Sequence, residues 1–258
     1  MAFDMNNFVI DRVVRGVALS QTDDSVMFAL NQITNPSLSC SSESTDAVDA
    51  LGTPLATFYR SKSAEFSAEN AIFDMSLMAA QVGSAKQVAS DSDKITIPAF
   101  ETIDIDGTSA TYTLEHVPLE EIKTIYALNG DGTLGTVFTK STSASASSFA
   151  ISGSTLTPPT GLKKGDQLFV IYEYESSQAV AVLNSANNFP TACKFILEVL
   201  GCDVCDQTKM VFAYLIFPNF KISPDFDWNI QSDGTHPFSG KAMQEYCDKN
   251  KRLELIAA

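Results

Sequence analysis

Hydrophobic and polar residues alternate along most of this chain, which is the two-residue period of a β-strand. The clearest case is 226–231, FDWNIQ, in which aromatic or aliphatic residues alternate with acidic and amide residues. Together with the residue before it, this stretch has the polar positions Asp225, Asp227, Asn229 and Gln231. We therefore expect a strand with one packed face and one face in water that carries acids and amides.

Many other short stretches have the same character and are separated by turn signals such as Asp106-Gly107 and Asp233-Gly234. A hairpin is expected across the Asn-Gly-Asp-Gly sequence at 129–132. The expected strands are 25–32, 37–42, 56–66, 94–100, 102–106, 110–116, 123–128, 136–139, 149–152, 155–157, 167–174, 194–200, 209–217, 221–222, 225–231 and 236–243.

Only one stretch, 70–82, has the spacing of an amphipathic helix. Its hydrophobic stripe is formed by Ile72, Met75, Ala79 and Val82. Ser67 or Asn70 can cap its start, and Gly83 follows its end, where a glycine terminates many helices. The pattern thus predicts a mainly β protein with one helix.

Composition narrows the class of protein. The chain has 258 residues, of which 45% are hydrophobic and only 19% are charged, below the roughly 25% typical of soluble domains. Such a chain can bury a large core and also surface against copies of itself. Its net charge of −14 argues against binding nucleic acid through phosphate neutralisation.

Targeting signals and disulfides are not predicted. The longest hydrophobic run, at 210–217, is far shorter than the roughly 20 residues of a membrane span. The first residues lack the basic-then-hydrophobic order of a signal peptide, so we expect folding in the cytoplasm. The five cysteines, an odd number, are expected to be free thiols.

No motif predicts chemistry. Cys202 and Cys205 have metal-knuckle spacing, but a structural zinc needs four ligands and no second pair follows. His116 and His236 each lie next to a turn without a signalled partner, so we interpret both as locally satisfied turn residues. The loop at 129–132 lacks the ligand spacing of a calcium site. We expect no catalytic residues, no cofactor and no metal, and hence not an enzyme.

Several segments nevertheless resemble the major tail tube proteins of long-tailed bacteriophages. The resemblance is spread over most of the chain and consists of a series of segments rather than one diagnostic motif. The matching segments are 8–16 (FVIDRVVRG), 26–32 (VMFALNQ), the strand and loop region 41–66 with the helix at 70–82, 216–221 (IFPNFK), 233–238 (DGTHPF) and 242–247 (AMQEYC).

The resemblance implies a β-sandwich or barrel of the tail-tube type with one flanking helix. It further implies homohexameric rings that stack into a hollow tube, through which phage DNA passes without specific binding. The implied partners are other copies, the tape measure protein, the terminator and the baseplate, with no membrane contact. The implied location is the virion tail, after synthesis in the bacterial cytoplasm.

The resemblance also suggests roles for particular residues. Long hairpin strands from neighbouring copies would line the channel, which makes 56–66, with Tyr59, Lys62 and Glu65, the candidate tube hairpin. The acidic and amide strip Asp225, Asp227, Asn229 and Gln231 is a candidate channel lining, because like charge would repel DNA. Two alternatives stay open: the strip faces the outside, or 56–66 lines the channel instead.

Domain organisation has two open interpretations. We expect a single domain over 1–258 with an N-terminal arm at 1–20 that reaches a neighbouring ring. The Ser/Thr-rich middle, 95–182, is either part of that domain or an inserted sandwich-like module. The alternative functions are another virion role, such as capsid decoration or a tail adaptor, and a surface- or glycan-binding sandwich.

Overall fold

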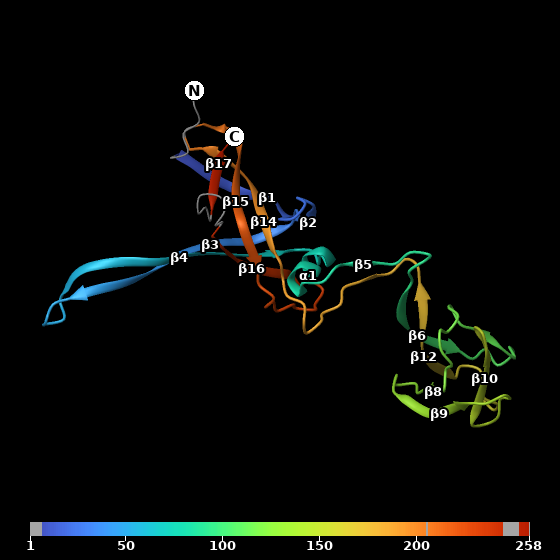
Figure 1. The fold of residues 1–258 in the computed structure, drawn as a ribbon. Coiled ribbons are helices and arrows are strands. Elements are labelled where there is room, and N and C mark those ends of the chain that lie inside the picture. The colour runs from blue at the N-terminus through green and yellow to red at the C-terminus, as the bar shows by residue number, and fades with distance from the viewer. Residues whose placement is uncertain (1–6, 205, 245–252, 258) are drawn as a thin grey trace. The chain divides into compact units, whose positions relative to one another are not determined.

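The structure, a computed structural model, describes residues 7–204, 206–244 and 253–257 and is mainly β (Figure 1). The described residues contain one α-helix, which confirms the predicted fold class. Contacts within the chain form two compact units, Met1–Lys86 with Val182–Ala258, and Gln87–Ala181. We call these unit 1 and unit 2.

Unit 1 is built on one sheet with the strand order β2-β1-β14-β15-β16-β4-β3, and β17 also pairs with β15. The end strands β2 and β3 are joined by only 31–32, so the sheet curls back on itself as a nearly closed barrel. The elements of unit 1 are β1 (Phe8–Ser20), β2 (Val26–Leu30), β3 (Ile33–Val48), β4 (Pro54–Asn70), α1 (Met75–Val82), β14 (Ala192–Asp203), β15 (Asp206–Ile222), β16 (His236–Ala242) and β17 (Glu254–Ala257).

Aromatic side chains fill the barrel. Phe195 of β14 is fully buried, and its ring centroid lies 5.1 to 6.1 Å from those of other phenylalanines. These neighbours are Phe28, Phe66, Phe217, Phe220 and Phe238. The alternation predicted for 194–200 therefore points one set of side chains into this aromatic core.

The helix starts later than its hydrophobic pattern predicts. Asn70 is the last residue of β4, and α1 begins at Met75 after the cap residue Asp74, whose side chain accepts a 2.7 Å hydrogen bond from the Leu77 N–H. The expected caps Ser67 and Asn70 are wrong because both residues pair with β16. Gly83 does end the helix, in the left-handed conformation.

The expected N-terminal arm, 1–20, contains a strand of the unit 1 sheet. Within the expected arm 1–20, Phe8–Ser20 forms β1, which pairs with β14 along its length and with β2 at its end. Strand β2 pairs only with Gly16–Leu19 of β1, so the edge of β1 at 8–15 has no second strand partner among the described residues, and the reach of the arm to a neighbouring ring stays a prediction. Residues 1–6 lie outside the described part of the chain.

Unit 2 has its own sheet, with the order β6-β12-β8-β9-β10-β11-β7, and a small β13-β5 pair. The predicted hairpin across 129–132 joins β8 to β9, while the expected strands 94–100 and 102–106 form the single strand β6. The elements are β5 (Gln87–Val88), β6 (Ile95–Asp104), β7 (Tyr112–Thr113), β8 (Thr124–Leu128), β9 (Leu134–Lys140), β10 (Ser148–Ser152), β11 (Thr155–Thr157), β12 (Gln167–Ser176) and β13 (Val180–Ala181).

Unit 2 also has its own core, separate from the aromatic core of unit 1. It is formed by Ile103, Ile105, Leu114, Ile122, Ile125, Phe138, Phe149, Leu156, Leu168, Val170 and Tyr172. The two interpretations of 95–182, as part of one domain or as an inserted module, differ in whether unit 2 folds independently of unit 1. Both stay predictions.

Candidate functional site

The most unusual feature of unit 1 is the hairpin formed by β3 and β4, which extends far beyond the other strands (Figure 1). Strand β16 pairs with β4 only over Ala64–Asn70. The rest of β4, at 54–63, therefore pairs with β3 alone, and the outer edge of β3 has no strand partner among the described residues. We call the segment 37–63, of which 41–63 is two-stranded, the ribbon.

Both faces of the ribbon are exposed. Every residue of β3 after Ile33 is exposed, and so is every residue of β4 up to Ser63. An isolated two-stranded hairpin is marginally stable in water, and its free edges present unpaired backbone N–H and C=O groups. The ribbon thus has unpaired backbone groups and exposed side chains with which a partner can interact.

A bulge sets which side chains share a face of the ribbon. Ser42 pairs with Lys62 but Glu43 pairs with Arg60, so Ser61 is an extra residue, and its φ of 49° is the left-handed conformation typical of such bulges. As a result, Lys62 and Tyr59 lie on one face. This face continues the inward-facing row of the barrel.

The third predicted hairpin residue, Glu65, lies on the opposite face. Its carboxylate forms an ion pair with Lys241 of β16, with 3.1 Å between Oε1 and Nζ. The structure therefore places all three candidate residues on β4 but divides them between the two faces. Their role in a tube is untested and stays a prediction.

The end of the ribbon is hydrophobic around a tight turn. The Asp49 carboxylate accepts hydrogen bonds from the backbone N–H groups of Thr53 and Leu51, and these bonds lower the pKa of Asp49. The Leu51 side chain is 91% exposed at the tip, and Val48 and Leu55 on either side are also exposed. A turn closed by hydrogen bonds to a carboxylate thus presents apolar side chains to the surroundings.

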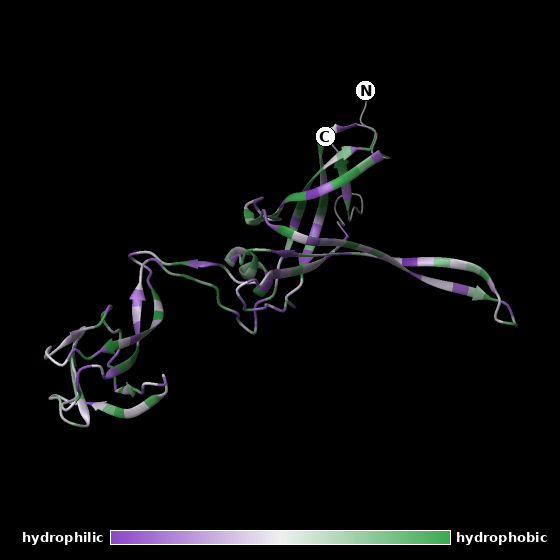
Figure 2. Cartoon of the chain, turned by 180° about the vertical axis from the view of Figure 1, so that it is seen from behind, coloured by the Kyte–Doolittle hydropathy of each residue, from purple (hydrophilic) through white to green (hydrophobic). Residues whose placement is uncertain are grey.

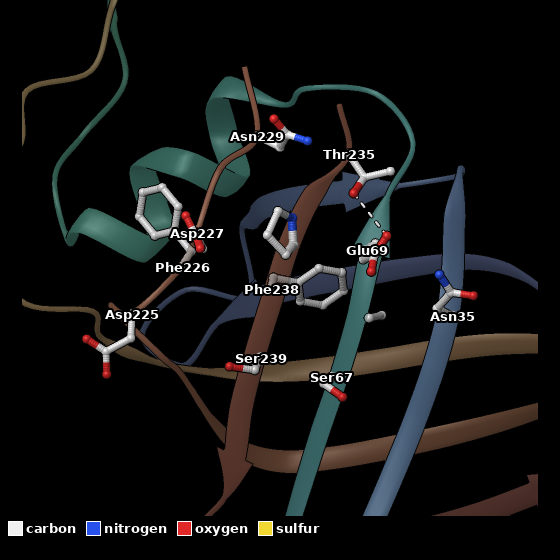
Figure 3. Close-up of a pocket in the computed structure, with 12 residues that line it drawn as sticks. Asn35, Ser67, Glu69, Asp225, Phe226, Asp227, Asn229, Thr235, Phe238 and Ser239 are labelled. Atoms are coloured by element: carbon white, nitrogen blue, oxygen red, sulfur yellow. Dashed lines mark hydrogen bonds between the residues drawn. The ribbon is translucent and has the colours of Figure 1, made fainter. Parts of the chain in front are cut away.

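The predicted strand at 225–231 is not a strand. It runs as extended loop beside β16 and β4 and lines a hollow of about 410 Å³ with Asp225, Asp227 and Asn229 (Figure 3). Across the hollow, the Thr235 hydroxyl donates a 2.9 Å hydrogen bond to Glu69. The predicted strip is exposed, as expected, but its backbone has no ladder partner in the described chain.

Aromatic stacking explains why this segment leaves the sheet. Trp228 stacks on Phe73 with 4.3 Å between the ring centroids, and Phe73 stacks on His236 at 4.9 Å. Ile230, by contrast, is 80% exposed, so the alternation of dry and wet residues ends after Trp228. The hydrophobic residues of the pattern thus anchor the loop to the region before α1.

His236 is fully buried in a hydrogen-bond network whose other side chains lie far from it in the sequence. Its Nε2–H donates to the Gln81 side-chain oxygen at 2.8 Å, and its Nδ1 accepts from the Asp74 N–H at 3.3 Å. Gln81 in turn donates to the Pro237 carbonyl at 2.9 Å. The expectation of a locally satisfied turn residue is wrong, because the partners come from the helix segment.

This network makes unit 1 sensitive to acid. Burial lowers the pKa of His236 below its ordinary value of 6.5, because the neutral ring fits the network and the charged ring does not. Below pH 6.5 the unfolded chain binds a proton that the folded chain does not, so stability falls as the pH falls. Urea unfolding from pH 7.5 to 5 should show this loss, and His236→Gln should weaken it; an unchanged pH slope in the variant would contradict the assignment.

The remaining candidates show no assembled chemistry. His116 stacks on Tyr174 of β12 at 3.7 Å. Cys193 is buried, Cys202 is partly exposed and Cys40 is exposed, and all three are free thiols, whereas Cys205 and Cys247 lie outside the described residues. Over 7–204, 206–244 and 253–257, no group of three or more potential metal-ligating side chains is found.

The described part of the chain contains no helix long and apolar enough to cross a bilayer. A search of curated proteins finds no match to this chain. A family model described as the YomU/Tube protein family matches residues 8–252, nearly the whole chain. That range includes both units and the ribbon, and it agrees with the resemblance to tail tube proteins. The chain therefore belongs to the YomU/Tube protein family, a family of tube-type structural proteins.

Proposed function

We propose that copies of this chain form homohexameric rings, and that these rings stack into the hollow tail tube through which phage DNA is delivered. The observation that carries this proposal is the ribbon at 37–63, with two exposed faces and with edges that lack strand partners within the described chain. Pairing between copies would complete those edges and remove a surface that otherwise invites aggregation.

A second incomplete edge supports the same arrangement. On the side of β15 that faces β16 and β17, pairing is limited to Ala213–Ile216 and Phe220–Ile222 within the described residues. The start of β15, at 206–212, therefore also offers backbone groups for a neighbouring sheet. Closed rings of identical copies use each edge once, so no copy is left with an open edge.

Charge supports passage of DNA rather than binding. The net charge of −14 disfavours adhesion of a polyanion to any wall that this protein forms. Asp225, Asp227, Asn229 and Gln231 are our candidate channel lining, and the ribbon face with Tyr59 and Lys62 is the alternative. In either case, the protein would act as a passive conduit and not as an enzyme.

Thiol labelling separates these two possibilities. We expect Asp227→Cys to react with a maleimide carrying a large polymer before assembly, and to be protected from it in tubes while a small maleimide still reacts. Lys62→Cys, treated in the same way, tests the ribbon face. Full reactivity of Asp227→Cys toward the large reagent in intact tubes would remove this strip from the channel wall.

The proposed partners follow from the tube. They are other copies of the chain, and at the tube ends and inside it the tape measure protein, the terminator and the baseplate. Negative-stain electron microscopy of the purified chain tests the proposal, and we expect hexameric rings or hollow tubes. Particles that remain single at high concentration, with or without these initiating partners, would contradict it and favour a decoration or adaptor role.

A further inference from the structure

The outer surface of the barrel carries apolar side chains where β1, β14 and β15 approach their ends. The inward residues of β14 are buried, while its outward residues Leu200 and Cys202 stand beside β15 on one side and β1 on the other. Figure 2 shows green, hydrophobic stretches along this end of the strands. We call this surface the outer face; it consists of Val9, Leu200, Cys202, Met210, Phe212 and Ile256.

This outer face is open in the described chain. Phe212 is 42% exposed, and Val9, Met210 and Ile256 are about half exposed. Register aligns its residues in rows, because Val9 and Met210 both lie opposite Cys202, and Phe212 lies opposite Leu200. Apolar residues that form adjoining rows on an exposed sheet face are typical of an interaction surface.

Positive charge lies next to the apolar rows. Arg12 pairs with Leu200 in the β1–β14 register, and Arg15 pairs with Glu198 one row further along. The Arg15 guanidinium forms an ion pair with Glu198, with 2.6 Å between Nε and Oε2. Within the part of the chain that the structure describes, Arg12 forms its ion pair with the exposed Asp11 beside it, an interaction that contributes little, so we expect its charge to be accessible to an incoming acid.

The end of the ribbon carries apolar and acidic side chains that can complement the apolar and basic side chains of the outer face. From the tip inward it presents Leu51, then Val48 and Leu55, and then Asp46. Asp46 shares a face with Val48, because two residues along a strand return to the same side. The tip therefore offers exposed apolar side chains around the Asp49 turn, followed by the Asp46 carboxylate. The outer face offers the apolar row at Cys202, followed by a row in which Arg12 lies opposite Leu200.

We propose that the ribbon end of one copy docks on the outer face of a second copy, with Leu51 against the row at Cys202 and Asp46 toward Arg12. Both surfaces belong to unit 1, and each is left exposed by the described chain. The contact is heterologous, so repeating it links copies in series rather than in closed pairs. This inference rests on the proposed tube function and specifies which surface receives the hairpin.

Cross-linking tests the contact. In a background of Cys40→Ser, Cys205→Ser and Cys247→Ser, Leu51→Cys should be joined to Cys202 of another copy by a short bis-maleimide, giving a ladder of multimers on denaturing gels. Cys193 will not interfere, because burial raises the pKa of its thiol to about 12. Adding Cys202→Ser should remove the ladder, and Thr45→Cys, which lies on the other face of the ribbon, should not form one.

The outcomes of the cross-linking experiment distinguish failure of the docking proposal from failure of the proposed tube function. Tubes with a ladder that depends on Cys202 support the docking. Tubes of Leu51→Cys without that ladder overturn the docking and leave the tube function standing. Failure of the unaltered chain to form tubes overturns the function itself.

A charge exchange provides an independent test that does not alter the apolar contact. Asp46→Arg and Arg12→Asp should each raise the protein concentration needed for assembly by about tenfold, and the double variant should restore it. All of these variants should unfold at the same temperature, since both side chains are exposed. Single and double variants with equal assembly defects would overturn the pairing.

Discussion

Replacing 44–59 with Asn-Gly should abolish tube assembly and leave the barrel folded. Glu43 lies opposite Arg60, so a two-residue type I′ turn can join them without altering the rest of the hairpin. Every residue removed except the partly exposed Asp49 is exposed, and no core side chain is lost. We expect unfolding to occur within a few degrees of the parent, while electron microscopy shows only unassembled particles.

A matched control shows whether the effect is specific to the ribbon. Shortening the β8–β9 loop of unit 2 by replacing 129–132 with Asn-Gly also removes exposed turn residues from a hairpin. We expect that variant to assemble normally. Tubes of normal appearance from the ribbon deletion would show that the ribbon is dispensable, and the proposed assembly would then be wrong.

Phe195→Ala should produce the largest loss of stability of any single change in unit 1. The Phe195 ring is fully buried among five other phenylalanines, and a large-to-small change at such a site costs about 3–5 kcal/mol. Urea unfolding monitored by the fluorescence of Trp228, which lies in unit 1, measures that loss.

The matched change in unit 2 is Phe149→Ala, because Phe149 is also fully buried but belongs to the other core. We expect Trp228 to report a loss for Phe195→Ala and little change for Phe149→Ala. Equal losses for both variants would mean that the two cores unfold together as a single cooperative domain. The experiment thus also decides whether the middle of the chain is an inserted module.

Local patterns predicted much of this fold, because turn and packing preferences act over short distances. The end of α1 at Gly83 and the β8–β9 hairpin follow from residue types that favour those conformations. The alternation at 167–174 and 194–200 identified β12 and β14, whose buried residues fill the two cores. In these elements local preference and tertiary packing agree.

The errors arise where contacts with residues distant in the sequence determine the local structure. The stretch at 225–231 has the period of a strand, yet Trp228 packs on Phe73 and the segment finds no ladder partner in the described chain. His236 looked locally satisfied, but its partners come from α1 and its cap. Pairing across 155 or more residues leaves no signal in the local sequence.

The length of the ribbon was also missed. The hydrophobic pattern predicted strands only at 37–42 and 56–66, whereas β3 and β4 have 16 and 17 residues. Serine and acidic residues along β3 weaken the usual strand signal, because neither face carries the hydrophobic row that a core would need. The lack of an apolar face is what we expect of a strand that does not pack on the core of its own chain.

Hydrogen exchange most directly tests whether neighbouring copies complete the ribbon. Backbone amides at 37–48 and 55–63 should exchange rapidly in the unassembled protein, because the ribbon is exposed and its edges lack strand partners in the described chain. On assembly, peptides from these segments should become strongly protected, while peptides from β14 should change little. Assembled tubes in which the ribbon amides still exchange as fast as in the single chain would contradict this account.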